Sequence, residues 1–411
     1  MQKSEKSDLQ HLFSIPVIVA ALGYFVDIYD LLLFGIVRLP SLASLGLSDA
    51  ESSSVGASIL NWQMTGLLCG GILWGVLGDK KGRLSVLFGS ILTYSIANIF
   101  CGFVQDPLVY KLLRFVAGVG LAGELGAGIT LVSEILPKRL RGIGTSLVAG
   151  VGLLGAVVAY FTVEFFAWRL AYFIGGGMGI SLLLLRLGVF ESGVFEHVKS
   201  DSRIKKGNFF SLFTNLNRLS RYLKCIGMGL PTWFVIGILA TFSNEFGRAL
   251  NLPEPVKPGL SIMWCYIGLS IGDVASGFLS HALKSRKKAV LCLMALTLSA
   301  CLYYLFGGIK TTQAFYITTL VLGLGIGYWA MFVTIGAEQF GTNLRATAAT
   351  TIPNMVRGTV VLMTTAFASL KVSFNVLNAG ALVGVVCFVI GVSSVLTLPE
   401  THDKDMDFLE E

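Results

Sequence analysis

The sequence predicts an all-α membrane protein, in which twelve membrane-spanning helices form two pseudo-symmetric six-helix bundles. Of the 411 residues, 54% are hydrophobic and only 13% are charged, whereas about 25% of residues are charged in an ordinary soluble domain. The hydrophobic residues fall into twelve long runs, and polar landmarks in the first six runs recur in the last six. Such a chain needs a bilayer as the solvent for most of its surface.

The twelve runs have the length of membrane-spanning helices. A helix rises 1.5 Å per residue, so about 20 apolar residues cross a hydrocarbon layer about 30 Å thick. Strands of membrane barrels instead alternate polar and apolar residues over about 10 positions, and these runs are continuous. The predicted spans are 14–38, 55–77, 85–104, 109–131, 142–163, 169–190, 223–243, 259–282, 289–308, 313–335, 348–368 and 376–398.

Basic residues between the runs predict the orientation and the domains. Lys and Arg prefer cytoplasmic loops, and basic clusters occur at 78–83, 137–142, 191–222 and 284–288. Both termini are therefore expected in the cytoplasm. The segment 191–222 is the longest polar one, so it predicts a cytoplasmic linker between an N-terminal bundle, 1–190, and a C-terminal bundle with a short tail, 223–411. The polar start of the chain has no signal-peptide features, and the first helix is expected to remain as an anchor.

Two landmarks repeat between the predicted halves. Glu134 and Arg141 recur 204 residues later as Glu338 and Arg345. A glycine-led basic turn at 75–83 recurs 202 residues later, with a histidine in place of its acid. A parallel repeat of six helices, with a binding site at the interface near the bilayer midplane, is typical of transporters.

One of these landmarks carries a family resemblance. The segment G-x-L-x-D-x-x-G-R resembles the loop between helices 2 and 3 of the major facilitator superfamily, and here it consists of Gly75, Leu77, Asp79, Gly82 and Arg83. The segments at 114–120, 190–195 and 398–401 are similar to helix 4, to the end of helix 6 and to the C-terminal segment of its metabolite:proton symporters and sugar porters. The resemblance covers nearly the whole chain and implies the major facilitator fold.

Charged and small residues near the predicted cytoplasmic ends are candidates for a conformational gate. Opposite charges can pair across neighbouring helix ends in one conformation and separate when the halves swing apart, and a glycine lets helices approach closely. The basic members could instead serve only to orient the chain in the membrane. The candidates are Gly75, Asp79, Gly82, Arg83, Arg114, Glu134, Arg141, Asp273, His281, Glu338 and Arg345.

Three acids within the runs are candidates for proton coupling. An ionisable side chain at bilayer depth costs at least about 3 kcal/mol, and most such residues face a cavity. Asp27 and Asp30 lie three residues apart in the first run and therefore share a helix face, and Glu124 lies in the fourth run. We expect Asp27 or Glu124 to carry the proton, with Asp30 sharing it or pairing with Arg114. The alternative is a purely structural pair between helices.

A lone arginine in the eleventh run predicts an anion site. The guanidinium of Arg357 offers a fork that matches a carboxylate or a phosphate, although it could instead pair with an acid of the chain. Asn354 is expected on the same face, and Pro353 is expected to interrupt the helix. The other candidate substrate-binding residues are Gln63, Tyr328 and Trp329, whose rings could stack on an organic solute or lie at the headgroups.

These features favour a secondary active transporter working by alternating access. We expect proton-coupled symport of a small anionic or zwitterionic metabolite across the inner membrane, by a monomer that uses the proton gradient and no cofactor. Export and facilitated diffusion are the alternatives within transport, and a membrane receptor is a remote one.

Other function classes lack the residues that they need. The basic residues form short clusters without a basic face, so nucleic-acid binding is not expected. With four histidines and seven cysteines that include no CxxC pair, neither a metal site nor a membrane enzyme is expected.

Overall fold

The structure, a computed structural model, describes residues 11–81, 83–124, 128, 132, 136, 140–191 and 209–402. Within these ranges, side chains are described except at 78–81, 83–85, 141–143, 145–146, 188–191, 342–343 and 346. Two candidate gate residues, Gly82 and Glu134, lie outside the described residues, and the side chains of Asp79, Arg83 and Arg141 lie outside the described side chains.

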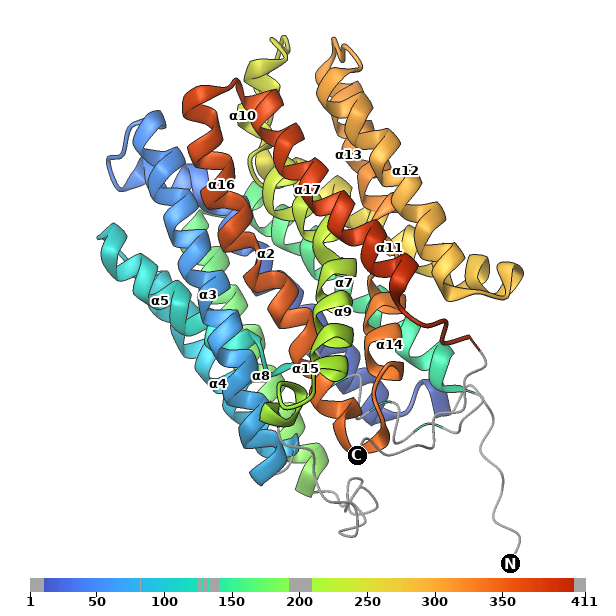
Figure 1. The fold of residues 1–411 in the computed structure, drawn as a ribbon. Helices are drawn as coiled ribbons and strands as arrows, with labels where there is room; N and C mark the ends of the chain where they lie inside the picture. Colours follow the sequence, from blue (N-terminus) through green and yellow to red (C-terminus); the bar gives the residue numbers. More distant parts are fainter. Residues whose placement is uncertain are drawn as a thin grey trace, which may run out of the picture.

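The described chain is a bundle of long helices (Figure 1). Those of the first half are α2 (Ile15–Ser44), α3 (Asp49–Lys81), α4 (Arg83–Cys101), α5 (Pro107–Leu121), α7 (Arg141–Phe165) and α8 (Trp168–Glu191). A short 3-10 helix, η3 (Phe209–Leu212), precedes the second half. The second half contains α9 (Leu216–Phe234), the π-helix η4 (Val235–Ala240), α10 (Ser243–Ala249), α11 (Pro258–Leu283), α12 (Arg286–Phe306), α13 (Thr312–Gly325), α14 (Trp329–Glu338), α15 (Thr342–Gly358), α16 (Val360–Ser373) and α17 (Val376–Thr397).

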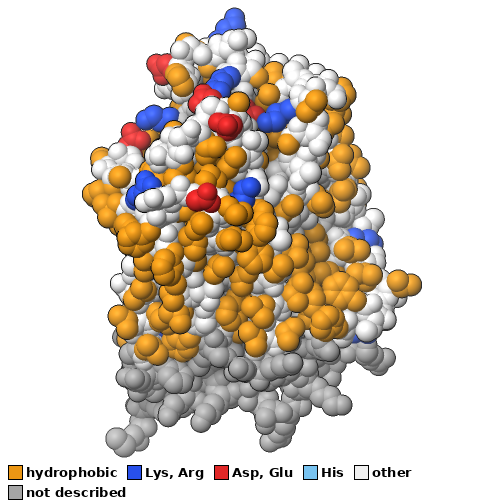
Figure 2. Space-filling view, turned by 90° about the vertical axis from the view of Figure 1, so that its left-hand side faces the viewer, with side chains coloured by type: hydrophobic (Ala, Val, Ile, Leu, Met, Phe, Trp, Pro, Cys, Tyr) orange, Lys and Arg blue, Asp and Glu red, His pale blue; other side chains and the backbone are white. Residues whose placement is uncertain are grey.

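The helices confirm the predicted all-α membrane fold. Ten stretches of the described chain are long and apolar enough to cross a membrane, and Val86–Cys101 is a shorter apolar helix. The remaining predicted span, 109–131, begins in α5 and continues beyond the described residues. Apolar side chains cover the middle of one face of the molecule, while acidic and basic side chains gather toward one end (Figure 2).

Three predicted spans are interrupted in ways that the sequence did not show. The seventh contains η4, the tenth breaks between Gly325 and Trp329, and the eleventh is interrupted at Thr359. The prediction that Pro353 breaks the eleventh helix is wrong, because Pro353 lies inside α15. A proline removes only one helical hydrogen bond, and α15 continues through it while packing against α3 and α9.

Polar side chains mark where several helices begin. At the start of α5, the Asp106 carboxylate accepts the N–H groups of Leu108 at 2.8 Å and Val109 at 3.1 Å, and Pro107 needs no partner for an N–H. Such caps satisfy donors that the first turn leaves free. Four other side chains cap helices in the same way, namely Asn215, Ser285, Thr311 and Asn375.

Glycines allow the closest contacts between helices. A Cβ atom at Gly118 of α5 would collide with the backbone of α3 at Gln63, and one at Gly66 would collide with the backbone of α5 at Phe115. Membrane helices gain little hydrophobic energy by associating, so such close packing supplies much of the attraction. The expectation for Gly75 is wrong, since a Cβ there would lie 3.5 Å from the nearest atom, in ordinary contact with Thr351.

The two halves meet along two seams. In the first, α2 and α7 pack against α11, and in the second, α3 packs against α15 and α16 (Figure 1). The loops α2–α3, α7–α8, α10–α11, α12–α13 and α16–α17 lie at one end of the molecule, toward the top of Figure 1, which is called the distal end below.

The glycine contacts predict an asymmetric response to alanine. Gly118→Ala should destabilise the protein by about 1–3 kcal/mol, because the added methyl meets backbone atoms that cannot turn aside. Gly177→Ala is the matched control, since a Cβ there meets nothing within 4 Å. Thermal unfolding of both variants in the same detergent measures the difference. Equal melting temperatures would contradict this account of the α3–α5 contact.

Candidate functional site

A narrow interior pocket lies where helices of both halves converge. Its described lining is mostly aromatic and aliphatic, with one charged residue, Arg357. An apolar cavity with a few polar groups is the usual form of a small-molecule site. The lining residues are Tyr24, Ile28, Leu153, Thr232, Trp233, Ile236, Tyr266, Leu269, Trp329 and Arg357.

Arg357 faces Asp27 across the boundary between the halves. The Arg357 Nη2 atom lies 3.8 Å from Asp27 Oδ2, and the two side chains are 1% and 0% exposed. Among the described residues, neither Asp27 oxygen has a hydrogen-bond partner, and the same holds for Nε and Nη1 of Arg357. The two groups therefore balance one another's charge without being locked together, and each keeps bonding capacity.

Tryptophan rings form one wall of the pocket. The ring centroids of Trp233 and Trp329 lie 6.2 Å apart, and Arg357 lies over the Trp233 ring at 5.7 Å. Trp329 is the first residue of α14, directly after the break in the tenth span. The buried Asp273 of α11 accepts the backbone N–H of Ala330 at 3.0 Å and so holds the start of α14. Asp273 thus supports the pocket wall.

Arg114 binds neutral oxygen atoms rather than an acid. It donates to the main-chain oxygen of Asp30 at 2.9 Å, to Asn98 Oδ1 at 2.8 Å and to Gln63 Oε1 at 3.3 Å. The expected pairing with the Asp30 carboxylate is wrong, because its oxygens have no hydrogen-bond partner among the described residues. Arg114 fixes α2, α3 and α4 around itself inside the first half.

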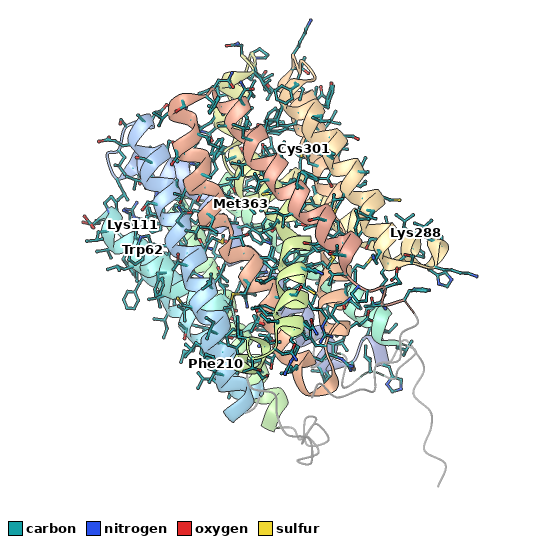
Figure 3. The ribbon with its side chains drawn as sticks, viewed as in Figure 1. Trp62, Lys111, Phe210, Lys288, Cys301 and Met363 are labelled. Carbon is teal, nitrogen blue, oxygen red and sulfur yellow. The ribbon has the colours of Figure 1, made fainter. Side chains whose placement is uncertain are left out.

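Gln63 also lies apart from the pocket. Its amide donates to the Leu31 carbonyl at 2.9 Å, which leaves it in the interior of the first half. The preceding residue, Trp62, points outward beside α5 (Figure 3) and is 41% exposed. Successive residues of a helix point in different directions, so Trp62 faces outward while the Gln63 amide faces the interior of the first half.

Glu124 forms a buried ion pair that sequence reasoning missed. Arg186 of α8 donates to both carboxylate oxygens, with Nη1 at 3.1 Å from Oε2 and Nη2 on Oε1. Gly23 of α2 faces this pair, and a Cβ there would collide with both side chains. The available signal was a basic residue within the predicted span 169–190.

Tyr328 and Asn354 serve packing between helices rather than the pocket. The Tyr328 hydroxyl donates to the Met228 carbonyl at 3.3 Å. The Asn354 amide donates to the Ala122 carbonyl of the first half at 2.8 Å. Of the five predicted substrate-binding residues, Trp329 and Arg357 line the pocket.

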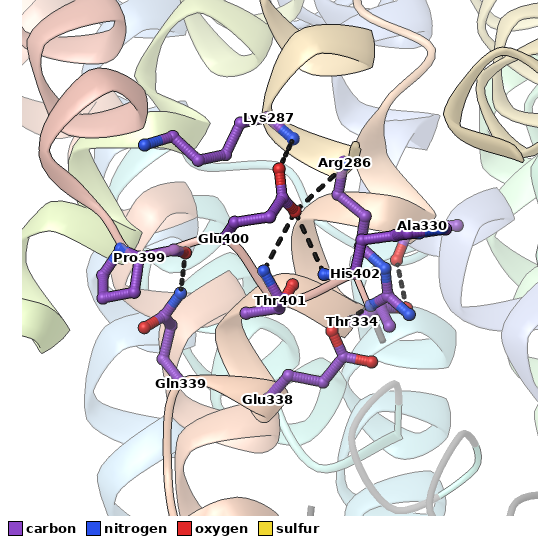
Figure 4. Close-up of polar contacts among 10 residues, drawn as sticks. All are labelled: Arg286, Lys287, Ala330, Thr334, Glu338, Gln339, Pro399, Glu400, Thr401 and His402. Carbon is purple, nitrogen blue, oxygen red and sulfur yellow. Dashed lines mark hydrogen bonds and ion pairs between the residues drawn. The ribbon is translucent and has the colours of Figure 1, made fainter. Parts of the chain in front are cut away.

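Apart from Asp273, which lies beside the pocket wall, the described gate candidates of the second half lie at the end opposite the distal one. Glu338 pairs with Arg286 of α12 (Figure 4), His281 is exposed near the end of α11, and Arg345 lies in the first turn of α15. Beside them, Glu400 accepts hydrogen bonds from the Ser285 side chain and from the start of α12.

The Glu400 carboxylate is held in its ionised form. Partial burial would favour protonation, but hydrogen bonds from the Ser285 hydroxyl and from the backbone N–H groups of Lys287, Thr401 and His402 outweigh it and lower its pKa to about 2. The carboxylate therefore caps the start of α12, although Glu400 itself belongs to the segment after α17.

At the distal end, polar contacts that the sequence did not predict join the two halves. Two exposed ion pairs connect Asp49 with Arg248 at 3.0 Å and Glu164 with Lys257 at 3.4 Å. The Ser53 hydroxyl donates to Glu245 at 2.6 Å, and Arg38 reaches across to the Thr241 carbonyl at 2.9 Å. The residues that make these contacts are Arg38, Asp49, Ser53, Glu164, Thr241, Glu245, Arg248 and Lys257. The structure is closed at this end.

The described residues contain no group of three or more His, Cys, Asp or Glu side chains that could hold a metal ion. The polar groups at the pocket are the single guanidinium, the facing carboxylate, and hydroxyl and indole donors. This set can bind an organic anion and exchange a proton.

Comparisons with known proteins agree with this arrangement. The sequence profile of the Major Facilitator Superfamily matches residues 20–360. A Haemophilus influenzae protein assigned to metabolite transport is 26% identical over 405 residues, covering 95% of this chain and 97% of its own. The niacin transporter of Acinetobacter baylyi is 26% identical, covering 80% of each chain. The gentisate transporter of Corynebacterium glutamicum is 25% identical, covering 80% of this chain and 75% of its own.

The buried pair of Glu124 and Arg186 predicts a large stability loss when it is broken. Glu124→Gln should cost about 3–5 kcal/mol, because it leaves an uncompensated buried guanidinium. Glu164→Gln breaks an exposed pair and should cost at most about 1 kcal/mol. Thermal unfolding in detergent compares the two variants. If both lose the same small amount, the pair at Glu124 is not a buried structural one.

The Glu400 cap predicts a stability difference that depends on pH. Its pKa is lowered from an ordinary value of 4.5 to about 2, so the stabilisation is present above pH 4.5 and is lost as the pH falls toward 2. The melting temperature of Glu400→Gln should therefore lie below that of the wild type at neutral pH and approach it between about pH 4.5 and 2. Glu254→Gln, at an exposed distal loop, is the control. A gap that does not shrink over this range would refute the cap.

Proposed function

Since the chain belongs to the major facilitator superfamily, we propose that it imports a small aromatic carboxylate by alternating access, together with a proton. As a multi-pass membrane transporter of this family it is not an enzyme, which confirms that prediction. The observation that carries the proposal is the loose pairing of Arg357 with Asp27 beside an aromatic pocket.

The pocket chemistry supports an aromatic carboxylate as the solute. The guanidinium fork of Arg357 matches a carboxylate, and the rings of Trp233 and Trp329 offer flat apolar faces. Niacin and gentisate, named for two relatives, are both single rings with one carboxylate.

Competition for Arg357 supplies the coupling. A carboxylate solute that binds Arg357 takes the place of Asp27 as its counter-charge. The Asp27 carboxylate is then left buried without a partner, which is costly, so the site accepts the anion together with a proton on Asp27. Release of the solute returns Arg357 to Asp27 and expels the proton. One proton thus accompanies each carboxylate.

The other two predicted coupling acids take different parts in this scheme. Asp30 lies on the same face of α2 as Asp27, and its oxygens have no hydrogen-bond partner among the described residues, so it can exchange protons with the site. Glu124 is bound at both oxygens by Arg186. That pair serves as a structural support, and Asp27 is the proton carrier.

The distal end is assigned to the periplasm, because the basic residues 80–81, at the end of α3, and 286–288, at the start of α12, lie at the other end. The ion pairs of Asp49 with Arg248 and of Glu164 with Lys257 then form the outer closure. They separate when the two halves swing apart, and the inner-membrane protein works as a monomer with both termini in the cytoplasm.

Uptake of benzoate and nicotinate into proteoliposomes tests the proposal. Asp27→Asn should abolish accumulation driven by an imposed pH gradient while leaving counterflow exchange, because Asn cannot carry the proton. Arg357→Gln should weaken solute binding about 10- to 100-fold, as expected for the loss of hydrogen bonds to a charged group. Glu254→Gln, at an exposed distal loop, should still accumulate solute.

Two outcomes would contradict the proposal. If Asp27→Asn concentrates solute as the wild type does, Asp27 is not the proton carrier. Uptake by the wild type that is equal with and without the pH gradient would instead mean facilitated diffusion.

A further inference from the structure

Arg38 is a buried arginine without an acidic partner among the described residues. It lies on α2 near the distal end, and its side chain is 0% exposed. Its Nη2 atom donates to the Thr241 carbonyl at 2.9 Å and to Asn244 Oδ1 at 3.0 Å, both in the second half. Its guanidinium carbon lies 4.5 Å from the centre of the Phe242 ring. Two further nitrogens, Nε and Nη1, have no hydrogen-bond partner in the described chain.

The position of Arg38 relates it to the pocket. Asp27 and Arg38 are eleven residues apart on α2, which corresponds to about 16 Å along the axis and about 20° around it. The two side chains therefore point from the same face, and each reaches a residue of the second half. The π-helix η4 connects the two levels, since Ile236 lines the pocket and Thr241 directly follows η4.

The charge of Arg38 is poorly balanced in the closed structure. A buried charge without a counter-ion is costly, and a ring such as that of Phe242 offsets only part of that cost. Glu245 is the acid whose charge acts on Arg38, but it makes no ion pair with Arg38 and is already bound by Lys371 at 2.6 Å and by the Ser53 hydroxyl. The free donors Nε and Nη1 belong to a rigid planar fork, and a carboxylate is the group that complements such a fork.

We propose that Arg38 is a second anion site, which binds the carboxylate of the solute at the distal end before the carboxylate reaches Arg357. When the halves separate, Arg38 leaves Thr241 and Asn244 and its fork faces the opening. Closure returns Nη2 to these two acceptors while the anion moves about 16 Å inward to Arg357. Pro40, which cannot bond to the carbonyl one turn before it, gives α2 a place to bend beside Arg38.

This inference rests on the proposed function only in that the solute is anionic. Arg38 was outside the residues that sequence reasoning selected, because it lies at the end of the predicted span 14–38, where a basic residue can reach the headgroups. Its complete burial between the halves is what distinguishes it from such a residue.

A chemical experiment without solute tests the anion site. In a background without native cysteines, Ser52→Cys places a thiol on the face of α3 that carries Gly56, whose Cβ position lies 2.8 Å from the Arg38 side chain. Anionic and cationic methanethiosulfonate reagents of similar size are then compared. In Arg38→Gln the ratio of anionic to cationic reaction rates should fall about tenfold, because the field that concentrates anions is lost.

Matched variants make the result specific. Lys310→Gln removes a positive charge from an exposed distal loop and should leave the ratio unchanged. Arg38→Lys keeps the charge and should change the ratio less than threefold. An equal ratio in the wild type and in Arg38→Gln would overturn the proposal, and because the ratio compares two reagents in one protein, a change in how often the distal end opens cancels.

Benzoate uptake provides the second arm. Arg38→Gln should raise the KM about tenfold with little change in the maximal rate, and Arg38→Lys should raise it severalfold because it loses the fork. If Arg38→Gln does not fold, the Arg38→Lys variant decides the question by the same KM comparison. If the wild type takes up benzoate and the Arg38→Gln variant has the same KM, the proposal is overturned. If the wild type does not transport benzoate but the reagent ratio still falls, the anion site stands and the proposed solute class fails.

Discussion

The charge pair between Asp27 and Arg357 is the constraint on which the rest of the site depends. Each group is buried near the middle of the protein, where an isolated charge is expensive, and each belongs to a different half. The pair therefore draws together two bundles that gain little hydrophobic energy from one another in lipid. At 3.8 Å without a hydrogen bond, it is also weak enough for an anion to replace one partner. Such a pair fits the coupling proposed above, in which the carboxylate of the solute replaces Asp27.

The four arginines that are buried in the described part of the chain differ in how completely they are hydrogen-bonded. Arg186 is bound by both oxygens of Glu124, and Arg114 is bound by three neutral oxygens within the first half. These two hold helices in place. Arg357 and Arg38 lie between the halves and retain nitrogens without hydrogen-bond partners among the described residues. A guanidinium with bonding capacity left is suited to a ligand, whereas a saturated one is suited to architecture.

Interruptions in the helices gather around the pocket. The π-helix η4, the break before Trp329 and the interruption at Thr359 all belong to the second half, and η4 and Trp329 contribute to the pocket lining. Irregular backbone at membrane depth is tolerated where it is enclosed by protein or lines a cavity, and π-helical turns are frequent at functional sites. The second half thus provides the two tryptophan rings and the guanidinium, while the first half provides the acid and the Tyr24 ring.

The sequence by itself determined the helices and the membrane, and it singled out Asp27 and Arg357 as candidates, because long apolar runs and ionisable residues within them are visible without knowledge of packing. It could not determine which partners those residues meet. Whether Arg114 binds the carboxylate or the carbonyl of Asp30, whether Glu124 finds Arg186, and whether Gln63 and Asn354 face the pocket depend on how each helix is rotated against its neighbours. That rotation is decided by close contacts such as the one at Gly118, between residues far apart in the chain. Only the tertiary structure could therefore separate supporting residues from those that line the pocket.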